Sequence, residues 1–358
     1  MKQKKTTIHD IAKELNVTAS TVSRALKDHP RISQATKNAV SVIAKRLNYQ
    51  PNSIATALRN GKSSILGVIV PTSDRRFFAS AISGIEAVTN KAGYSLIICQ
   101  SDDLHQKENA NIDTLLNIQV DGIIASIAKE TTDLSAYNKI ISRGVPLILF
   151  DRTNDSLDVS AVVSNDYLAS YKAVSHLIEQ GCRRIMHFAG QQHIEIYKER
   201  LRGYKAALEK YDIPLDPDLI LERDLILDTE HVLTKGREWG KIILEMDDLP
   251  DAIFSASDFA AMGAMMVLKE HNYRIPQDIA VVGFSNDLST SFIEPALTTI
   301  DQYPKKMGMI AAKYFLDQVN TSGTTFTPRK TLINPTLIVR GSSLKIPSKT
   351  KTPEEETI

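Results

Sequence analysis

Two short amphipathic segments, separated by a tight turn, stand near the start of the chain. Residues 7–15 carry apolar side chains at i, i+3, i+4 and i+7, which is the spacing of one helix face. Asn16 then favours a turn, because Asn adopts the left-handed conformation more readily than other non-glycine residues. Residues 18–26 follow, with Thr18 as a natural N-cap and with hydroxyl groups and Arg24 opposite the apolar side. This arrangement predicts a helix-turn-helix motif.

The charge of the chain is unevenly distributed. Residues 1–62 hold twelve Lys or Arg against three acidic residues, a formal charge of +9, whereas the other 296 residues carry −8. The overall charge of +1 therefore conceals a basic head on an acidic body. Such a head is expected of a module that binds the phosphates of nucleic acid. A small helical bundle without DNA is the alternative for the helix pair, and the charge asymmetry argues against it.

The segments 17–26, 32–33 and 47–52 together resemble the head of the LacI-type (lactose/galactose repressor) family. The resemblance runs colinearly from about Thr7 to Arg340. It implies a sequence-specific DNA-binding transcriptional regulator that binds a pseudo-palindromic operator in double-stranded DNA as a homodimer. We expect a repressor, and activation of some promoters stays open because the sign of regulation depends on the position of the operator.

The resemblance also assigns DNA contacts to individual residues. Small hydroxyls and helix N-termini donate hydrogen bonds to phosphate oxygens, and an Arg can bond two acceptors on guanine. The implied base-reading residues are Ala19, Ser20 and Arg24. The implied phosphate contacts are Thr7, Thr18, Thr21, Ser23, Ser33, Thr36 and Asn52.

Residues 50–62 are predicted to form a hinge helix. Pro51 can open a helix and Gly61 can close one, but about two turns are too short to be stable alone. In the family this segment folds on DNA, pairs with that of the dimer mate and pushes a leucine into the minor groove, which bends the duplex. The matching residue is Leu58, with Ala55 one turn earlier on the same face, and ordinary core packing is the alternative for Leu58.

The rest of the chain has the pattern of an α/β protein. Short apolar runs alternate with amphipathic stretches, which predicts parallel sheets buried on both faces. About 280 residues exceed what one core fills, so two lobes are expected. Similarity to periplasmic sugar-binding folds implies the same body, with a ligand cleft between the lobes and crossings near residues 161, 290 and 323.

The predicted domains follow from these patterns. They are a helix-turn-helix domain at 1–49, the hinge helix at 50–62, an effector-binding body at 63–341 and a disordered tail at 342–358. The N-lobe is expected at about 63–161 and 291–323, and the C-lobe at about 162–290 and 324–341. The tail has two prolines, many charges and no heptad, so it should not join dimers into tetramers. The dimer contact is expected on the body and includes Ile82, Ile85 and Val88, with intrachain core as the alternative.

Ligands of parallel sheets bind at the carboxyl ends of the strands, where this chain places polar and aromatic residues. Carboxylates, an Arg fork and aromatic faces suit a polyhydroxylated effector, which we expect to be a sugar or sugar derivative. The predicted effector-binding residues are Phe77, Phe78, Asp151, Arg200, Ser257, Asp258, Ser285 and Asn286. Core packing is the alternative for Phe77 and Phe78, and helix capping for Asp258.

Within this set, Arg200 matches the effector-contacting arginine of the family. Ser257 stands where the family commonly has Asn, and Ser285 where many members carry an acid. Both changes remove hydrogen-bonding reach, so the effector is expected to be larger than a simple hexose or differently substituted. Asn286 or Asp287 could take the missing role.

The sequence offers no set of catalytic residues. The eight His are scattered without metal-ligand spacing, and neither a Gly-rich phosphate loop nor a nucleophile elbow occurs, so we expect no enzyme, no metal and no cofactor. Cys99 and Cys182 are too few for a disulfide framework. With no signal peptide and no long apolar span, we expect a cytoplasmic protein without membrane contact, which argues against a periplasmic binding protein.

Overall fold

The computed structural model describes residues 6–49, 62–222, 229–321 and 326–345. The chain divides into two compact units, Met1–Ser63 and Ser64–Ile358, which we call the head and the body. Each has its own hydrophobic core. In the described part of the chain, no helix is both long enough and apolar enough to cross a membrane.

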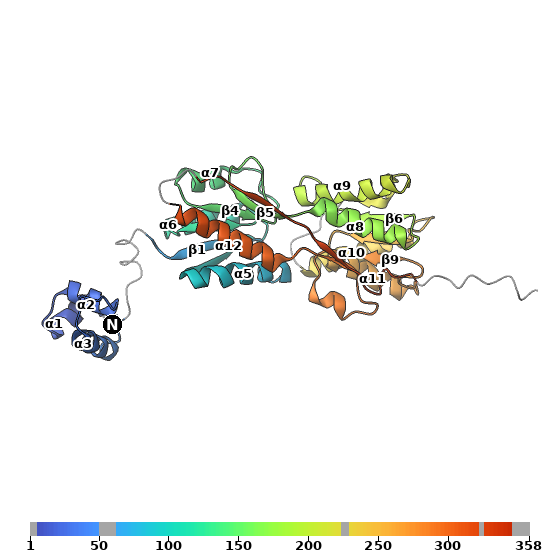
Figure 1. Cartoon of the computed structure of the whole chain (residues 1–358). Helices are drawn as coiled ribbons and strands as arrows, with labels where there is room; N and C mark the ends of the chain where they lie inside the picture. The colour runs from blue at the N-terminus through green and yellow to red at the C-terminus, as the bar shows by residue number, and fades with distance from the viewer. Residues whose placement is uncertain (1–5, 50–61, 223–228, 322–325, 346–358) are drawn as a thin grey trace, which may run out of the picture. The chain divides into compact units, whose positions relative to one another are not determined.

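The head contains the helices α1 (Ile8–Glu14), α2 (Ala19–Leu26) and α3 (Gln34–Arg46), as Figure 1 shows. Ile11, Val22 and Val40 are fully buried and join the three helices in one core. Asn16 has a φ of 53°, which confirms the predicted left-handed turn between α1 and α2. On α2, Ala25 is buried beside Val22, whereas Leu26 is 39% exposed.

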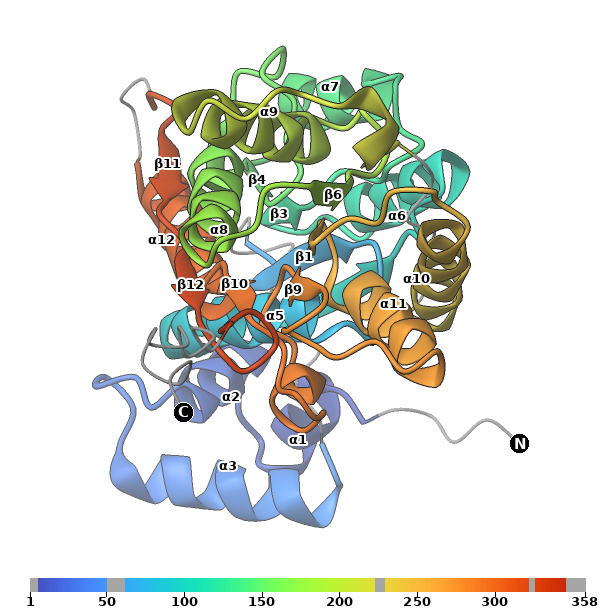
Figure 2. The ribbon, with the colours of Figure 1, turned by 90° about the vertical axis from the view of Figure 1, so that its right-hand side faces the viewer.

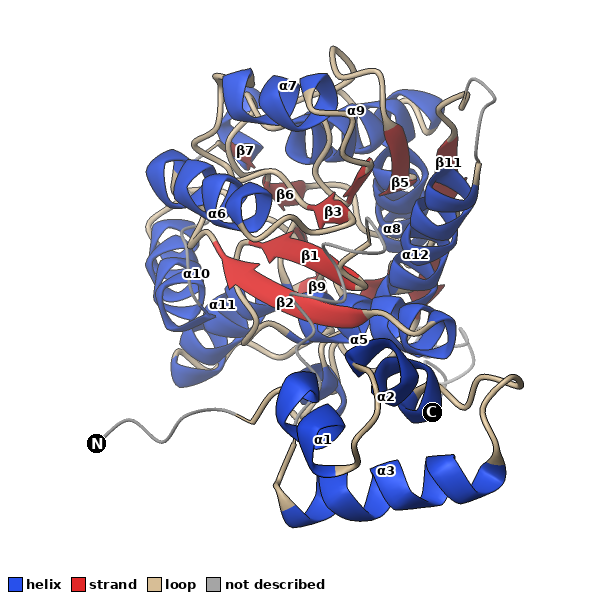
Figure 3. Ribbon diagram, turned by 90° about the vertical axis from the view of Figure 1, so that its left-hand side faces the viewer, coloured by secondary structure: helices blue, strands red, loops and turns tan. Residues whose placement is uncertain are grey.

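The first lobe of the body is built on a parallel sheet, in the order β11-β5-β4-β3-β1-β2. Its strands are β1 (Ile65–Val70), β2 (Ser95–Gln100), β3 (Gly122–Ala125), β4 (Leu147–Phe150), β5 (Ser160–Ser164) and β11 (Lys330–Ile333). One face is covered by α5 (Arg76–Thr89) and α12 (Pro304–Asn320), the other by α6 (His105–Asn117) and α7 (Ser135–Ser142), as Figure 3 shows. A short 3-10 helix, η1 (Asn90–Ala92), leads into β2.

The second lobe has a parallel sheet in the order β7-β6-β8-β9. Its strands are β6 (Ile185–Phe188), β7 (Ile220–Leu221), β8 (Ala252–Ser255) and β9 (Ala280–Val282). The helices α8 (Asp166–Glu179) and α9 (Glu195–Lys210) pack on one face, and α10 (Thr229–Leu244) and α11 (Asp258–Glu270) on the other (Figure 2). An antiparallel pair, β10 (Thr299–Asp301) with β12 (Thr336–Ile338), and the 3-10 helices η2 (Pro217–Leu219) and η3 (Leu288–Ser291) complete the lobe. The predicted α/β fold with parallel sheets is confirmed.

The chain crosses between the lobes later than two of the three predicted positions. β10 lies inside the expected N-lobe segment 291–323, yet it pairs with β12 in the second lobe. β11 lies inside the expected C-lobe segment 324–341, yet it pairs with β5 in the first sheet. The crossings therefore follow β5, β10 and β11. These lobe boundaries depend on which strands pair across long sequence distances. The local pattern of apolar and polar residues does not reveal that pairing.

The structure also bears on the predicted tail and on the predicted dimer contact. The predicted disordered tail began at 342, but Ser342 is fully buried and its Oγ donates to Val281 O at 2.6 Å, which fixes the start of that segment to the second lobe. Residues 346–358 lie outside the described residues. Ile85, an expected dimer contact, is fully buried in the first lobe, and Ile82 and Val88 pack against the same cluster. The intrachain alternative holds for Ile85, whereas Ile82 and Val88 are half-buried and stay predicted dimer contacts.

Candidate functional site

Hydroxyl groups gather at the N-termini of α2 and α3 in the head. Thr18 caps α2 by accepting a hydrogen bond from Thr21 N at 3.2 Å, and its Oγ1 lies 2.8 Å from Ser20 Oγ. Ser33 caps α3 in the same way by accepting from Thr36 N at 3.2 Å. Helix N-termini carry a partial positive charge and point their N–H groups outward, so both ends are suited to phosphate oxygens.

The side of α2 away from the core presents Arg24. This side chain is exposed, whereas Val22 and Ala25 on the opposite side are buried. Ala19 and Ser23 on the same helix are half-buried. The helix can therefore offer Arg24 to a partner without disturbing the core.

The acids of the head are engaged inside it: Asp28 pairs with Lys37 at 2.7 Å, Glu14 pairs with Arg46, and Asp10 accepts from Thr7 N at 2.7 Å. Thr7 stands at the N-cap of α1. The exposed cations Arg24, Lys27 and Arg31 thus dominate the field around α2. The predicted contacts Asn52, Ala55 and Leu58, and most of the predicted hinge helix, lie outside the described residues.

In the body, a cavity of about 80 Å³ lies between the two lobes and is lined from both. Six of the eight predicted effector residues meet there: Phe77, Phe78, Asp151, Arg200, Ser257 and Ser285. They come from the start of α5, the end of β4, the first turns of α9 and the loops after β8 and β9. The carboxyl ends of strands in both sheets therefore converge on one site, as the rule for parallel sheets predicts.

Arg200 is held in place by bonds within the second lobe. Its Nε donates to Asp166 Oδ1 at 2.8 Å, and its Nη1 donates to Ala256 O at 2.9 Å. The guanidinium carbon lies 3.6 Å from the centroid of the Phe284 ring. The side chain is buried yet lines the cavity, so its orientation is fixed before any ligand arrives.

On the first-lobe side, Asp151 and Arg152 follow β4 directly. Asp151 has a φ of 60°, and its Oδ2 accepts from Ser126 Oγ at 3.3 Å. Burial raises the pKa of Asp151 to about 6, and Arg152 opposes that shift. Arg152 is itself buried and ion-paired with Asp103. These charges lie out of bulk water, where their interactions are stronger than on an open surface.

Sequence reasoning missed eight cavity residues, which are Arg75, Lys129, Arg152, Ile196, Tyr197, Val232, Ala256 and Gln302. For two of these residues, the position in the sequence could have indicated that they line the cavity. Arg152 directly follows the predicted Asp151, and Lys129 stands four residues past the end of β3, so both lie at strand carboxyl ends. The structure buries Lys129, whose side chain is only 10% exposed.

Two predicted effector residues do not reach the cavity. Asp258 is 1% exposed, and its carboxylate accepts from Thr299 Oγ1 at 2.5 Å and from Asp287 N at 2.8 Å. Asn286 donates to Asp301 Oδ2 at 3.2 Å and accepts from Arg340 at 2.8 Å. Both side chains join β10 and the C-terminal segment to the rest of the second lobe. The hydrogen bonds of Asp258 and Asn286 are made within the second lobe, so both side chains stabilise the fold.

Comparison with known proteins places this architecture in a family. Residues 7–52 match the bacterial regulatory proteins of the lacI family, and residues 174–343 match the periplasmic binding protein-like domain. The HTH-type transcriptional repressor PurR of Actinobacillus pleuropneumoniae serotype 3 is 30% identical over 339 residues, which cover 94% of this chain and 98% of that protein. This chain belongs to the lacI family of bacterial regulatory proteins. As a lacI-family member it is a sequence-specific DNA-binding transcriptional regulator, and the predicted family is confirmed.

Solved structures share the fold of this lacI-family chain. A lac repressor dimer bound to operator and the anti-inducer ONPF has a TM-score of 0.81 at 23% identity, covering 95% of this chain and 100% of that one. A LacI-family regulator of Enterococcus faecium with bound ribose has a TM-score of 0.68 at 25% identity, covering 79% of this chain and 99% of that one.

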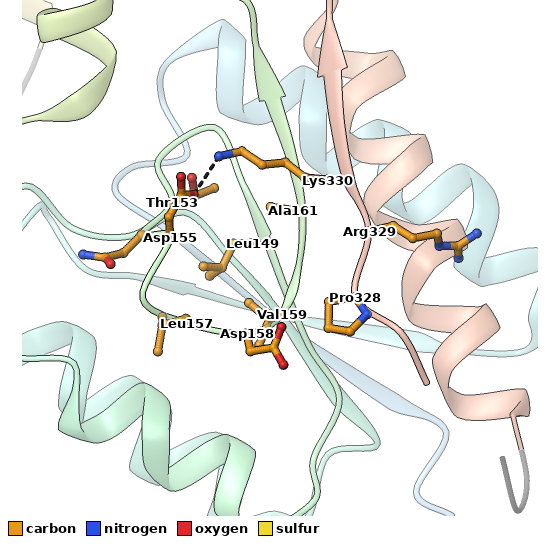
Figure 4. Close-up of a pocket in the computed structure, with 11 residues that line it drawn as sticks. Leu149, Thr153, Asp155, Leu157, Asp158, Val159, Ala161, Pro328, Arg329 and Lys330 are labelled. Carbon is orange, nitrogen blue, oxygen red and sulfur yellow. Dashed lines mark hydrogen bonds and ion pairs between the residues drawn. The ribbon is translucent and has the colours of Figure 1, made fainter. Parts of the chain in front are cut away.

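A second cavity of about 210 Å³ lies in the first lobe, beside β4, β5 and β11 (Figure 4). It is the larger of the two, but both of its cations are paired locally: Lys330 with Asp155 at 2.6 Å, and Arg329 with Asp317 at 2.5 Å. All of its lining residues belong to the first lobe. A ligand there would not connect the lobes, so the smaller cavity is the better candidate for an effector.

Proposed function

We propose that this regulator represses transcription as a homodimer on a pseudo-palindromic operator, and that a small polyhydroxylated molecule bound between its lobes sets its affinity for DNA. The family match and the relative described as a repressor support the first part. The lac repressor structure, a dimer on its operator, and the regulator with bound ribose support the rest.

The observation that carries the ligand proposal is the cavity lined by both lobes. Arg200 provides a preset donor fork from the second lobe, while Phe77 and Tyr197 offer ring faces to C–H surfaces. A ligand that contacts both sides stabilises one arrangement of the lobes over another, because it binds the two arrangements with different affinity. The three chain crossings provide the only covalent joints between the lobes within the described residues.

For the head we propose that Arg24, Ser20 and Ala19 face base edges while the capping hydroxyls of α2 and α3 bind phosphates. The exposed side of α2 and the engaged acids support this assignment. Two symmetry-related heads need two inverted half-sites. Because its partner is bacterial DNA, we propose that the protein acts in the cytoplasm and regulates without catalysing a reaction.

In vitro selection of random duplex DNA by the full-length chain tests the proposal. We expect two half-sites in inverted repeat, whose affinity falls steeply with salt as phosphate contacts release counterions. A thermal-shift screen with sugars should then find a molecule that raises the melting temperature and changes operator affinity. Selection of DNA without an inverted repeat, or a stabilising ligand that leaves operator binding unchanged, would contradict the proposal.

A further inference from the structure

A buried carboxylate outside the cavity between the lobes contacts two residues that line it. Asp103 is 2% exposed and does not line the cavity itself. Its Oδ1 accepts a hydrogen bond from Lys129 N at 3.1 Å and another from Arg152 Nη1. Its Oδ2 lies 3.8 Å from Lys129 Nζ. Because both partners line the cavity, one side chain holds two residues of the first-lobe wall.

Asp103 connects loops that follow three strands of the first sheet. It stands in the turn between β2 and α6, whereas Lys129 follows β3 and Arg152 follows β4. Asp102 and Asp103 have φ values of 51° and 60°, a left-handed turn that Asp and Asn adopt more readily than most residues. The backbone adds a bond between two of these loops, since Glu130 N donates to Asp103 O at 3.2 Å. The carboxylate therefore joins segments that are far apart in the sequence.

The charges around Asp103 form a balanced group. Burial by itself would raise the pKa of Asp103, but Arg152 and Lys129 outweigh burial and hold that pKa below its ordinary value. Hydrogen bonds to an ionised acceptor are stronger than neutral ones. Arg152 Nε also lies 3.8 Å from Asp151 Oδ2, so the group contains two cations and two carboxylates. Its effect is to fix the positions of these side chains.

The residues held by Asp103 face the second lobe. Lys129 Nζ lies 5.9 Å from the centroid of the Tyr197 ring on α9, which is within the range of a cation–π contact. Burial raises the pKa of Asp151 to about 6, and both Arg152 and Arg200 oppose that rise. The charges of the two walls therefore act on each other across the cavity, and their interaction depends on where the first-lobe side chains are held.

A second buried carboxylate in the same lobe has partners of a different kind. Glu108 on α6 is fully buried and accepts from Ala128 N at 2.7 Å and from Thr131 Oγ1 at 2.6 Å. Neither of these partners lines the cavity. Both carboxylates hold the loop after β3, but Asp103 holds residues that face the cavity and Glu108 holds residues that do not.

We propose that Asp103 is a positioning residue of the effector site: it fixes Lys129 and Arg152 in the first-lobe wall and thereby sets the affinity for the effector without touching it. This inference rests on the proposed function and adds a residue outside the cavity. A wall that is held before the ligand arrives loses less conformational freedom on binding, so its contacts contribute more to affinity. Without the charge of Asp103, the two cations share Asp151 alone and can turn away from the cavity.

Acetylation of Lys129 by acetic anhydride, measured by mass spectrometry on the full-length protein, tests this without any ligand. Asp103→Asn removes the charge, and Asn tolerates the φ of 60°. Lys129 should then react at least about fivefold faster, because a charge-assisted contact no longer holds its amine. The matched control is Asp102→Asn, the same change one residue earlier, where the carboxylate is 44% exposed and pairs with Lys107. That variant should leave the rate at Lys129 unchanged.

Glu108→Gln separates positioning from stability. It should lower the melting temperature, because it removes the charge of a buried acceptor that has two donors. It leaves the contact between Asp103 and Lys129 in place, so the acetylation rate of Lys129 should stay at the wild-type value. A residue that served only stability would change the melting temperature without this selective effect on Lys129.

Calorimetric titration with ribose, glucose and cellobiose measures the consequence for binding. A sugar of this panel that binds the wild type should bind Asp103→Asn about tenfold more weakly and Asp102→Asn equally well. Operator affinity without sugar should stay at the wild-type value in both variants, because the head is a separate compact unit with its own core.

An unchanged acetylation rate of Lys129 in Asp103→Asn, or an equal acceleration in Glu108→Gln, would overturn the inference. A sugar that binds Asp103→Asn as tightly as the wild type would also overturn it and would leave the proposed function intact. Failure of the proposed function shows differently, as a sugar that binds the wild type without any change in operator affinity.

Discussion

At the scale of single residues, Arg200 links the ligand cavity to the internal bonding of the second lobe. Its pair with Asp166 is almost fully buried. Arg200→Ala would leave that carboxylate uncompensated, so we expect a loss of about 3 kcal/mol in the free energy of unfolding by urea. The double variant Arg200→Ala with Asp166→Asn should recover most of that stability and still fail to respond to the effector. A double variant that responds normally would remove Arg200 from the site.

Asp151 predicts a pH dependence of stability. Burial is the main cause that raises its pKa from 3.8 to about 6, so the folded protein holds this proton more tightly than the unfolded chain. Its ionisation therefore reduces stability as pH rises from about 4 to about 6. Asp151→Asn removes this effect, and Asn tolerates the left-handed backbone at this position.

We expect Asp151→Asn to raise the melting temperature at pH 7.5 and to have little effect at pH 4, with at most about 3 kcal/mol gained at the higher pH. Scanning calorimetry of both proteins across this range measures the difference directly. Comparing variant with wild type cancels the contribution of Asp258, whose pKa is also raised to about 6 by burial. An equal gain at both pH values would mean that the carboxylate is not the cause.

Arg24 predicts a base-specific effect in the head. Arg24→Ala should cost about 1–3 kcal/mol of operator binding at one position in each half-site, and it should relax the base preference there. Lys27→Ala is the matched control, since Lys27 is also exposed but follows the end of α2. Fluorescence anisotropy with single-base operator variants measures both. Equal weakening on specific and random DNA would make Arg24 a phosphate contact.

At the scale of elements, α5 and α12 pack through glycine. A Cβ at Gly308 would lie 2.0 Å from Ala81 O, and one at Gly84 would lie 2.1 Å from Lys305 O. Gly308→Val should therefore force the helices apart and cost roughly 3 kcal/mol in urea unfolding. Ala79→Val on the exposed side of α5 is the control and should change stability by less than about 0.5 kcal/mol. Similar stability of the two variants would contradict the close packing.

The elements also show what the sequence can and cannot predict. β1 and β3 coincide with two of the short apolar runs in the sequence, because a continuous apolar run identifies a strand buried on both faces. β10 and β12 were missed, since each has three residues and their pairing joins positions far apart in the chain. Sequence reasoning also identified the polar residues after β4 and β8. Their position at the edge of a sheet follows from the short apolar run directly before them.

The direction of side chains in the site could not be predicted. Asp258 looked like Asp151 in the sequence, because both follow a buried strand. Its bond to Thr299, a residue 41 positions later, turns it into the fold instead of the cavity. Lys129 was missed for the opposite reason: Asp103, 26 positions earlier, holds it at the cavity wall. Such long-range partners decide which polar residues serve a ligand and which serve the fold.

At the scale of the whole molecule, the opposite charges of head and body divide the tasks of the chain. The head is formally +9 and the rest is −8. An acidic body is repelled by phosphates, so DNA is confined to the head, and the body is left to bind a small molecule.

The proposed homodimer needs an apolar surface on the body, and the second lobe offers one. Phe292 is 77% exposed, Leu288 is 51% exposed and Met266 is 44% exposed. Ser289 Oγ donates to Met262 Sδ at 3.7 Å, which joins η3 to α11 and brings the segments that carry these side chains together. Clustered large apolar groups on a surface mark an association site more often than a solvated face.

Phe292→Asp should therefore weaken the dimer at least about tenfold, because burying a Phe side chain contributes about 1.5–3 kcal/mol and a two-fold contact contains it twice. Analytical ultracentrifugation at micromolar concentration measures the dissociation constant. Operator affinity should fall in parallel, since two heads held together bind both half-sites at a high effective concentration. Leu332→Ser is the matched control: Leu332 is 54% exposed on the edge strand β11 of the first lobe. If Phe292→Asp dimerises like the wild type, or Leu332→Ser dissociates equally, the dimer contact lies elsewhere on the body.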